Sequence, residues 1–395
     1  MRILAIETSC DETATAIVHG TGSIENPVFS LISQEVFSQA DLHTLYGGVL
    51  PNLARREHGQ KIIPLVTTTI EKVKSTPIES TEITLEHIKH ILLREPEVYD
   101  AIISNGLYLL KPEIDAIAVT QGPGLEPALW VGINTARALA LLWNIPLIPT
   151  NHMEGHIISP LLKAPGSPEV QSVAFPAIAL LISGGHTELV LTPSWGLYTT
   201  IGRTRDDALG EAFDKVARLL SLPYPGGALV SKLAKEARSE GAVPQEHGVH
   251  LPRPMIHSKD FDFSFSGIKT AVLYLIRDLT KTGELTDTQK KAIACEFENA
   301  VSEVITSKTK AACIAHSAKS LIVGGGVIAN DVIRERLETL GTELGITVLL
   351  PTRDLSTDNA PMIAMAGYIR ALEDRIITPN AILETVVKAE GNLSY

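Results

Sequence analysis

Two histidines four residues apart have the types and the spacing to do chemistry. His152 and His156 frame the run His-Met-Glu-Gly-His, which follows a stretch typical of a strand. On a helix, residues i and i+4 share a face, so both imidazoles could bind one metal ion. They would bind as neutral rings, since the unperturbed pKa is about 6.5. A chain with 12 histidines can also hold such a pair by chance, as caps or core residues.

A metal site needs more than two protein ligands, and Asp358 is the candidate third. It lies in the polar turn 356–359, directly before an apolar run at 360–369. Two imidazoles and one carboxylate suit either iron or zinc. An ordinary helix cap is the alternative role for an aspartate in this position.

A glycine turn in the second half of the chain is a candidate phosphate-binding loop. Ser183, Gly184 and Gly185 separate two expected strands, at 177–182 and 187–191. Glycine carries no Cβ, so the backbone N–H groups of such a turn can approach an anion closely.

A similar turn near the N-terminus is acidic. Residues 8–12 separate expected strands at 2–7 and 13–18, and they include Asp11 and Glu12. Two carboxylates would repel a phosphate, but they suit a general base or groups that act on an incoming nucleophile. A solvated, charged turn is the alternative.

Three further segments have the features of nucleotide-binding loops. Gly324–Ala329 follows an expected strand and opens a helix, so it fits G-x-G-x-x-A, which indicates either a dinucleotide-binding domain or the adenosine loop of another fold. Asp214, in Gly210–Lys215, precedes a helix and could reach ribose hydroxyls. Tyr224–Gly227 is a tight turn that permits close backbone approach.

The elements that must position these residues repeat between the two halves. A hairpin in each half predicts a duplicated α/β fold in which each half contributes one loop. The expected strand 114–120, turn 121–124 and helix 130–143 form a βα unit. An insertion of two helices is expected at 74–112, and a loop at 163–171.

Bulk composition is that of a globular protein. The chain has 395 residues, of which 45% are hydrophobic and 20% charged. Its three cysteines include no C-x-x-C pair, which fits a reducing, cytoplasmic location rather than a disulfide framework. No apolar run is long enough to span a bilayer, so no membrane partner is expected. The net charge of −11 argues against a surface generally coated with nucleic acid.

Taken in order, these segments resemble the tRNA threonylcarbamoyladenosine transferases of bacteria, archaea and eukaryotes. The matching blocks run in family order from residue 3 to about residue 367. They are Ile6–Thr13, Tyr46–Val49, Gln121–Leu125, His152–His156, Leu181–Thr187, Gly210–Lys215, Tyr224–Gly227, Asp262–Thr270, Gly324–Asn330 and Thr357–Asn359.

The resemblance implies a two-lobed α/β fold like that of actin, hexokinase and the heat-shock chaperones, with a duplicated mixed-sheet core and a cleft between lobes. Residues 1–165 would form the N-terminal lobe, with the first phosphate hairpin, the 74–112 insertion and the histidine pair. Residues 172–370 would form the C-terminal lobe, with the second phosphate hairpin and the adenosine loop. The segment 371–395 is expected to return to the N-terminal lobe.

The resemblance also implies a set of site residues. His152, His156 and Asp358 would bind one divalent metal, iron or zinc. Asp11 would accept a proton from the attacking amine, with Glu12 beside it. Threonylcarbamoyl-AMP, or ATP or AMP, would be held by residues of the second lobe: Leu181, Ile182, Ser183, Gly184, Gly185, Asp214, Gly227 and Asn330.

The implied reaction is transfer of the threonylcarbamoyl group to N6 of the adenosine 3′ of a tRNA anticodon, with release of AMP. Bacterial relatives work with an inactive paralogue and a small ATPase, and the archaeal and eukaryotic branch works with a small kinase. The segment 126–129 and Asn151 are similar to the second branch, whereas 183–187 and 152–156 are similar to bacterial relatives. Both partner sets therefore stay open.

Three other functions compete with this one. A metallopeptidase is suggested by the histidine pair, but Glu154 does not follow the first histidine as H-E-x-x-H requires. An ATPase or sugar kinase of the same fold would use both phosphate loops and leave the histidines and Asp358 without a purpose. A non-catalytic nucleotide-binding subunit would need neither the metal ligands nor the acidic turn.

Overall fold

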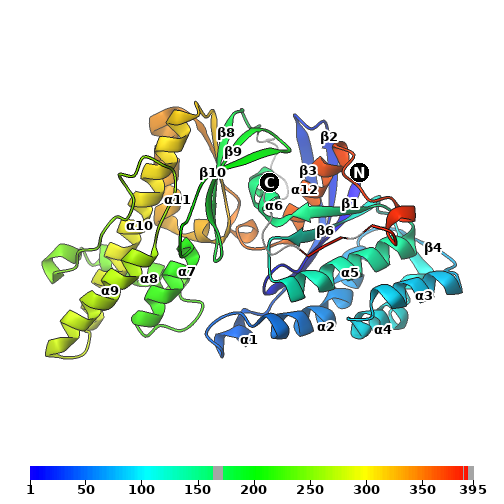
Figure 1. The fold of residues 1–395 in the computed structure, drawn as a ribbon, viewed down its shortest axis with the longest axis horizontal. Coiled ribbons are helices and arrows are strands. Elements are labelled where there is room, and N and C mark those ends of the chain that lie inside the picture. Colours follow the sequence, from blue (N-terminus) through cyan, green and yellow to red (C-terminus); the bar gives the residue numbers. More distant parts are fainter. Residues whose placement is uncertain (163–171, 386, 390–395) are drawn as a thin grey trace. The chain divides into compact units, whose positions relative to one another are not determined.

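A computed structural model describes residues 1–162, 172–385 and 387–389 (Figure 1). The chain divides into two compact units. Unit 1 comprises Met1–Ser172 and Thr357–Ser394, and unit 2 comprises Val173–Ser356. The expected loop at 163–171 lies outside the described residues.

Unit 1 is built on a five-stranded mixed sheet. Its central strand, β1, is antiparallel to β2 and parallel to β6, while β2 also pairs antiparallel with β3, and β6 pairs parallel with β7. The strands in spatial order are β3 (Pro27–Ser38), β2 (Glu12–Gly22), β1 (Arg2–Glu7), β6 (Ala116–Gly122) and β7 (Leu147–Asn151).

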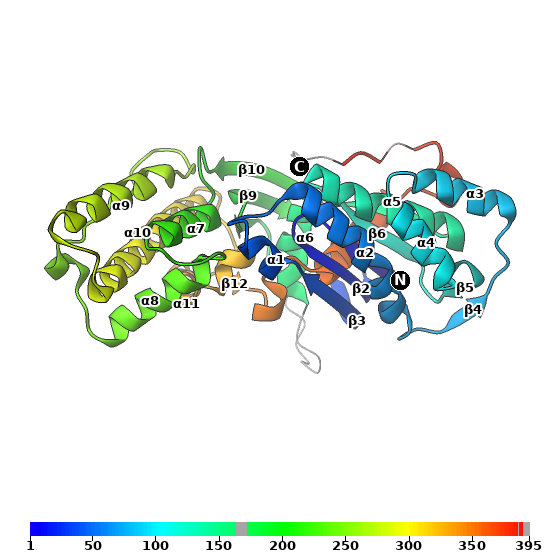
Figure 2. The same cartoon turned by 90° about the horizontal axis from the view of Figure 1, so that it is seen from below.

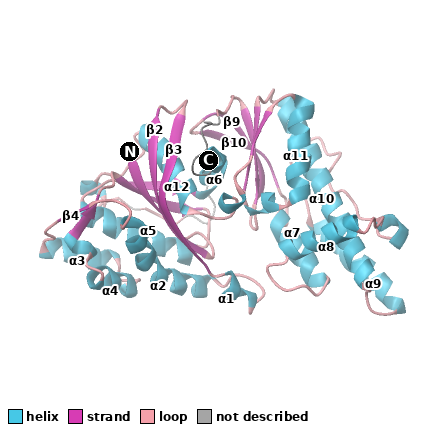
Figure 3. Ribbon diagram, turned by 180° about the vertical axis from the view of Figure 1, so that it is seen from behind, coloured by secondary structure: helices cyan, strands magenta, loops and turns pink. Residues whose placement is uncertain are grey.

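The two faces of this sheet differ in the size of their side chains, because successive strand residues point to opposite faces. Leu4 and Ile6 belong to the apolar cluster shared with α2 (Pro51–Ile70) and α5 (Glu126–Trp143). The opposite face carries alanines, and there α12 (Ala360–Leu372) contacts β1, β2, β6 and β7 (Figure 3). A Cβ on Gly367 would lie only 2.7 Å from that of Ala118, so α12 packs unusually close to the sheet.

The C-terminal boundary differs from the sequence expectation, which grouped residues up to 370 with the second lobe. The contacts of α12 are with the unit 1 sheet, because the small side chains on that face admit a helix. After α12, Ile377 pairs with Leu147 through two backbone hydrogen bonds of 2.8 and 2.9 Å, and Ile382 is buried in the unit 1 core.

The segment 74–112 contains two helices, α3 (Glu82–Ile91) and α4 (Pro96–Ser104). Its two ends meet where β4 (Ser75–Pro77) pairs antiparallel with β5 (Leu110–Pro112). Figure 2 shows α3 and α4 beside α5 and α2, which they contact. The short α1 (Ala40–Thr44) precedes α2.

Unit 2 repeats the strand order and directions of unit 1. The antiparallel hairpin β8–β9 extends to β10, and β8 pairs parallel with β11, which pairs parallel with β12. The strands in order are β10 (Leu197–Arg203), β9 (Thr187–Ser194), β8 (Ala177–Ile182), β11 (Ser320–Gly324) and β12 (Thr347–Leu349). The helices are α7 (Leu209–Leu219), α8 (Gly227–Ser239), α9 (Ser266–Leu279), α10 (Asp287–Ala315) and α11 (Asp331–Leu344).

The duplicated mixed-sheet core is therefore confirmed. The dinucleotide-binding interpretation of Gly324–Ala329 is not, because its sheet is mixed rather than the parallel sheet of that fold. Short 3-10 turns lie at Leu107–Leu109, Ser159–Leu161, Pro244–His247, Thr280–Thr282, Gly326–Ala329, Arg353–Leu355 and Pro379–Ala381. Within the part of the chain that the structure describes, no helix is long and apolar enough to cross a membrane.

Candidate metal centre and nucleotide-binding residues

The end of β7 presents both histidines at the start of α6 (His152–Ile158). Asn151 is the helix cap: its side-chain oxygen accepts hydrogen bonds from the backbone N–H of Met153 at 2.8 Å and of Glu154 at 3.4 Å. Neither histidine is needed as the cap. Their spacing places both rings on one face of the helix, with centroids 4.7 Å apart.

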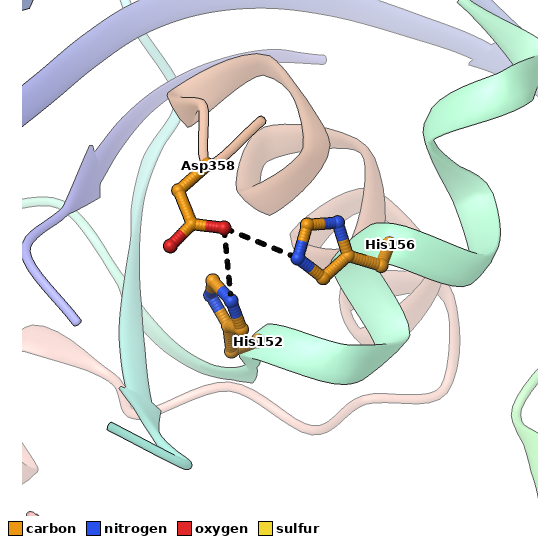
Figure 4. Close-up of side chains that lie close together, drawn as sticks. All are labelled: His152, His156 and Asp358. Atoms are coloured by element: carbon orange, nitrogen blue, oxygen red, sulfur yellow. Dashed lines mark ion pairs between the residues drawn. The ribbon is translucent and has the colours of Figure 1, made fainter. Parts of the chain in front are cut away.

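Asp358 lies close to both histidines, although it belongs to the second of the two chain segments that make up unit 1. The cap of α12 is Asn359, whose side chain accepts from the backbone N–H of Met362 at 3.0 Å, so the cap role weighed for Asp358 belongs to its neighbour. Oδ1 of Asp358 lies 3.3 Å from Nε2 of His152 and 3.2 Å from Nε2 of His156 (Figure 4). One ligand atom from each of the three residues falls within 4.8 Å of the others.

Helix α6, which carries both histidines, is fixed to α12, which begins just after Asp358. A Cβ on Gly155 would lie 3.0 Å from Met362, so α6 and α12 touch closely at this point. Glu154 forms a two-pronged ion pair with Arg370 of α12, at 2.7 and 2.8 Å. Both carboxylate oxygens are engaged in this ion pair, which argues further against a peptidase in which Glu154 acts as the general base.

The electrostatics of the three residues favour a positive charge between them. Burial lowers the pKa of His152, but the carboxylates of Asp358 and Glu7 outweigh it and raise that pKa well above the usual range. Burial raises the pKa of Asp358, yet the charge and hydrogen bonding of His152 and then His156 bring it well below the usual range. His156 is fully buried, and neither of its ring nitrogens makes a hydrogen bond of good geometry. An ion that accepted lone pairs from Nε2 of both rings would satisfy this donor set.

Glu7, which the sequence analysis did not single out, completes the surroundings of His152. Its side chain is fully buried, and Oε2 lies 3.0 Å from Nδ1 of His152 and accepts from the Thr120 hydroxyl at 2.6 Å. Burial raises the pKa of Glu7, but the charge of His152 outweighs burial and lowers it. In the sequence, Glu7 stands out only as a carboxylate at the end of the expected strand 2–7.

The acidic turn lies directly after Glu7. Glu12 is half-buried, and burial together with the negative charges of Asp358 and Asp11 raises the pKa of Glu12 to about 9. Glu12 is therefore protonated at pH 7 in the absence of a compensating cation. In that metal-free state Glu12 cannot accept a further proton, and the catalytic roles predicted for Asp11 and Glu12 stay predictions.

Two groups outside the turn hold its backbone in place. Nε2 of His58, on α2, donates to the carbonyl of Cys10 at 3.0 Å, and its Nδ1 lies 2.7 Å from the Thr13 hydroxyl. The backbone N–H of Gln39 donates to the carbonyl of Asp11 at 2.9 Å. Burial lowers the pKa of His58 to about 4, so the ring is neutral at pH 7 and serves as one donor and one acceptor.

In unit 2, the glycine turn has the open backbone expected of an anion-binding loop. A Cβ placed on Gly184 or Gly185 would meet no atom within 4 Å, and the turn is closed by the Ser183 N–H, which donates to the carbonyl of His186 at 2.8 Å. Leu181 and Ile182 are fully buried in β8. Only their backbone groups could contact a ligand.

Asp214 and Gly227 are brought together at the start of α8. Oδ1 of Asp214 accepts from the N–H of Gly226 at 2.8 Å and of Gly227 at 3.2 Å. Burial raises the pKa of Asp214, and these two N–H groups oppose that rise. The carboxylate thus stabilises the tight turn 224–227 while remaining half-buried.

Asn330 holds the loop Gly324–Ala329 in place rather than offering a free amide. Its Oδ1 accepts from the N–H of Ile333 at 3.0 Å, which caps α11, and its Nδ2 donates to the Ser231 hydroxyl at 2.8 Å and to Glu298. Both amide hydrogens are therefore used within the protein. Gly325, with φ of 92°, permits the loop to pass the carbonyl of Ile182, which a Cβ would approach to 2.5 Å.

Fold and site together define a class: an α/β protein with a duplicated mixed sheet, a candidate His-His-Asp metal centre with an acidic turn in unit 1, and a glycine turn in unit 2. Comparison with known proteins gives the family. The sequence profile of tRNA N6-adenosine threonylcarbamoyltransferase matches residues 30–85 and 88–365. The chain belongs to this family of transferases.

Relatives with that name match along almost the whole chain. The protein of Nitrosospira multiformis is 41% identical over 94% of this chain and 91% of its own. That of Ralstonia pickettii is 42% identical over 95% and 92%. Among solved structures, component A of the (R)-2-hydroxyglutaryl-CoA dehydratase of Acidaminococcus fermentans aligns over 95% of this chain and 99% of its own, with 11% identity and a TM-score of 0.43.

Proposed function

We propose that this chain transfers the threonylcarbamoyl group from threonylcarbamoyl-AMP to N6 of the adenosine 3′ of the anticodon in tRNA, releasing AMP. Membership of the family supports the reaction. The observation that carries the mechanism is the meeting of His152, His156 and Asp358 next to a turn that contains a carboxylate. An ATPase or sugar kinase would leave that meeting without a purpose.

We further propose that the enzyme depends on one divalent metal, iron or zinc, held by His152, His156 and Asp358. Two neutral imidazoles and a carboxylate match the donors that both ions accept. When bound, the ion supplies a Lewis acid that stabilises negative charge on the acyl group and the departing phosphate.

Unit 2 would hold the nucleotide. The N–H groups of the glycine turn Ser183–Gly185, with the backbone of Leu181 and Ile182, suit the phosphate. Asp214 and the N-terminus of α8 at Gly227 suit the ribose. Asn330 would act by fixing the adenosine loop, because its amide is already bonded to Ser231 and Glu298.

Asp11 would take the proton that the reaction releases. N6 of the adenosine attacks the carbonyl carbon of the threonylcarbamoyl group, the bond from that carbon to the phosphate oxygen breaks, and AMP leaves. The proton lost from N6 passes to the Asp11 carboxylate. In the metal-free chain, burial and the charge of Asp358 raise the pKa of Glu12 to about 9, so there Glu12 donates a hydrogen bond rather than accepting a proton.

We place the enzyme in the cytoplasm, because its proposed substrate is tRNA and its three free cysteines fit a reducing compartment. Protein partners would be either an inactive paralogue with a small ATPase or a small kinase. The net charge of −11 fits an enzyme that borrows part of its tRNA-binding surface from a partner. Binding of tRNA to the isolated chain is then expected to depend only weakly on salt.

The deciding experiment is mass analysis of nucleosides from unmodified tRNA incubated with the chain and preformed threonylcarbamoyl-AMP, with and without the candidate partners. We expect threonylcarbamoyladenosine with the wild type and none with His152→Ala. His87→Ala, an exposed histidine on α3, is the matched control and should leave the yield unchanged. Absence of product under every partner condition would refute the proposal.

A further inference from the structure

We infer that Glu7 is a positioning residue that ties the candidate metal centre to the acidic turn, fixing the ring of His152 and the backbone of Ser9 with one carboxylate. The inference rests on the proposed metal centre, and it extends the site to a residue outside the three ligands and the two turn carboxylates.

The first support is the burial and bonding of Glu7. Its side chain is 0% exposed, and a carboxylate removed from water is costly unless each oxygen is hydrogen-bonded. Oε1 accepts from the backbone N–H of Ser9 at 2.5 Å. Oε2 accepts from the Thr120 hydroxyl at 2.6 Å and lies 3.0 Å from Nδ1 of His152. The two oxygens thus serve two different parts of the site.

The second support is the protonation pattern that this contact imposes on His152. A ring that binds a metal is neutral, and because an ionised carboxylate can only accept hydrogen bonds, the one ring hydrogen of His152 must then sit on Nδ1. The lone pair of Nε2 then points toward Asp358, where the ligand atoms gather. Histidines that bind metals commonly donate their second N–H to a carboxylate, which fixes both the tautomer and the ring orientation.

The third support is the set of contacts that Ser9 makes at the start of the acidic turn. Its N–H is held by Glu7, its hydroxyl lies 3.3 Å from Nδ1 of His152, and its carbonyl accepts from the N–H of Leu125 at 2.7 Å. Asp11 follows two residues later. A shift of Glu7 would therefore move the ring of a metal ligand and the start of the acidic turn together.

The variant Glu7→Gln distinguishes a positioning role of the carboxylate from a role in packing alone. In Glu7→Gln the shape is kept, but one oxygen becomes an NH₂ group. If the NH₂ faces His152, it donates to Nδ1 and forces the ring hydrogen onto Nε2, where it blocks the metal. If the amide is turned over, the NH₂ faces the Ser9 N–H, and two donors oppose each other. Glutamine cannot satisfy both partners.

The test is titration of Co²⁺ into the metal-stripped full chain, followed by visible absorption, together with competition for Zn²⁺ against a chelating dye. Hydrogen–deuterium exchange of the segment 8–13 is measured on the same samples. We expect Glu7→Gln to bind Zn²⁺ about 10- to 100-fold more weakly, the usual loss when such an outer partner is removed. If the amide turns over, faster exchange of the segment 8–13 is expected in its place.

Glu95→Gln is the matched control, since Glu95 is 1% exposed, lies in the same unit and accepts from Asn134 at 2.9 Å. It should change neither readout. Wild-type affinity and wild-type exchange in Glu7→Gln would overturn the inference. Failure of the wild type to bind Co²⁺ or Zn²⁺ would instead overturn the proposed metal centre, so the two failures are distinguishable.

If Glu7→Gln does not fold, Thr120→Val provides the second variant. It keeps the carboxylate but removes the hydroxyl that steadies Oε2. A several-fold loss of Zn²⁺ affinity is expected, against no loss in Thr15→Val, which alters another buried threonine of the same sheet, bonded to Thr69 at 2.6 Å. Equal affinities in these two variants would overturn the inference.

Discussion

The two hairpin turns have the same backbone arrangement, which is called the shared frame below. Turn 1 joins β1 to β2 and begins near Ser9, and turn 2 joins β8 to β9 and begins at Ser183. In each, a glycine beside a helix N-terminus lies against the serine: a Cβ on Gly124 would be 2.7 Å from the Ser9 carbonyl oxygen, and one on Gly210 would be 2.7 Å from that of Ser183. A backbone N–H donates to the same carbonyl in both turns, from Leu125 at 2.7 Å and from Gly210 at 3.1 Å.

The side chains on this frame differ completely. Turn 1 carries Asp11 and is held by the carboxylate of Glu7 and the imidazole of His58. Turn 2 carries Gly184 and Gly185, around which there is open space. Two equivalent turns thus carry different side chains: turn 1 holds the carboxylate that we propose takes up a proton, and turn 2 holds the glycines that we propose bind an anion. Backbone geometry thus locates the two turns, whereas their side chains decide which chemistry each can support.

The largest expected effect separates the chemistry of turn 1 from binding. Asp11→Asn removes the proposed proton acceptor and should lower the single-turnover transfer rate by about 10²- to 10⁴-fold. Affinity for AMP, measured by calorimetry, should stay within about twofold. Glu12→Gln is the control, because Glu12 lies in the same turn and the amide keeps the size and shape of its side chain. Equal losses in both variants would mean that Asp11 has no special role.

The second effect tests how turn 1 is held. The pKa of His58 is about 4 in the folded protein because the ring is buried, against about 6.5 when unfolded. As the pH falls from 6.5 to 4, the unfolded chain takes up a proton that the fold excludes. The folded state then loses up to about 3 kcal/mol, and this contribution is fully present only above pH 6.5.

His58→Gln lacks this titration. The free energy of unfolding of the wild type, minus that of the variant, should therefore fall by about 3 kcal/mol between pH 7 and pH 4 in chemical denaturation. Other titrating groups are common to both chains and cancel in the difference. A difference that does not change with pH would show that His58 titrates normally in the fold.

Much of this frame could be predicted from the sequence, since both hairpins have strong apolar and β-branched runs. The edge strand β3 (Pro27–Ser38) was missed because most of its residues are half-buried or exposed, which weakens the apolar signal. The long helix α10 (Asp287–Ala315) was also missed. Its buried face includes Glu296, Glu298 and Lys308, so its pattern is not simply amphipathic.

The site shows a similar division. The spacing of His152 and His156 is local, so the sequence could predict their common face. The roles of Glu7 and His58 depend on contacts with residues 145 and 48 positions away, and nothing in the neighbouring sequence reveals them. The bonds of Asn330 to Ser231 and Glu298 form only on folding, so the sequence could not reveal them, and its predicted part in nucleotide binding stays a prediction.

The third effect tests anion binding by turn 2. A Cβ added at Gly184 would meet no atom within 4 Å, and its φ is not positive, so substitution there should not disturb the fold. Gly184→Asp places a negative charge beside the proposed phosphate and should weaken AMP binding by about 10- to 100-fold. Gly184→Ala, which adds only the Cβ, should bind within about threefold of the wild type. Equal affinity of all three chains would locate the phosphate elsewhere.

The smallest expected effect tests the shared frame itself. Gly124→Ala and Gly210→Ala each force a Cβ to within 2.7 Å of a backbone carbonyl oxygen, which cannot rotate away as a side chain can. Each should destabilise the fold by about 1–3 kcal/mol in chemical denaturation, and the two costs should be similar because the surroundings are alike. Gly48→Ala, with no atom within 4 Å, should cost less than about 0.5 kcal/mol. A large cost at one glycine with none at the other would show that the two turns are held by different means, despite their matching topology.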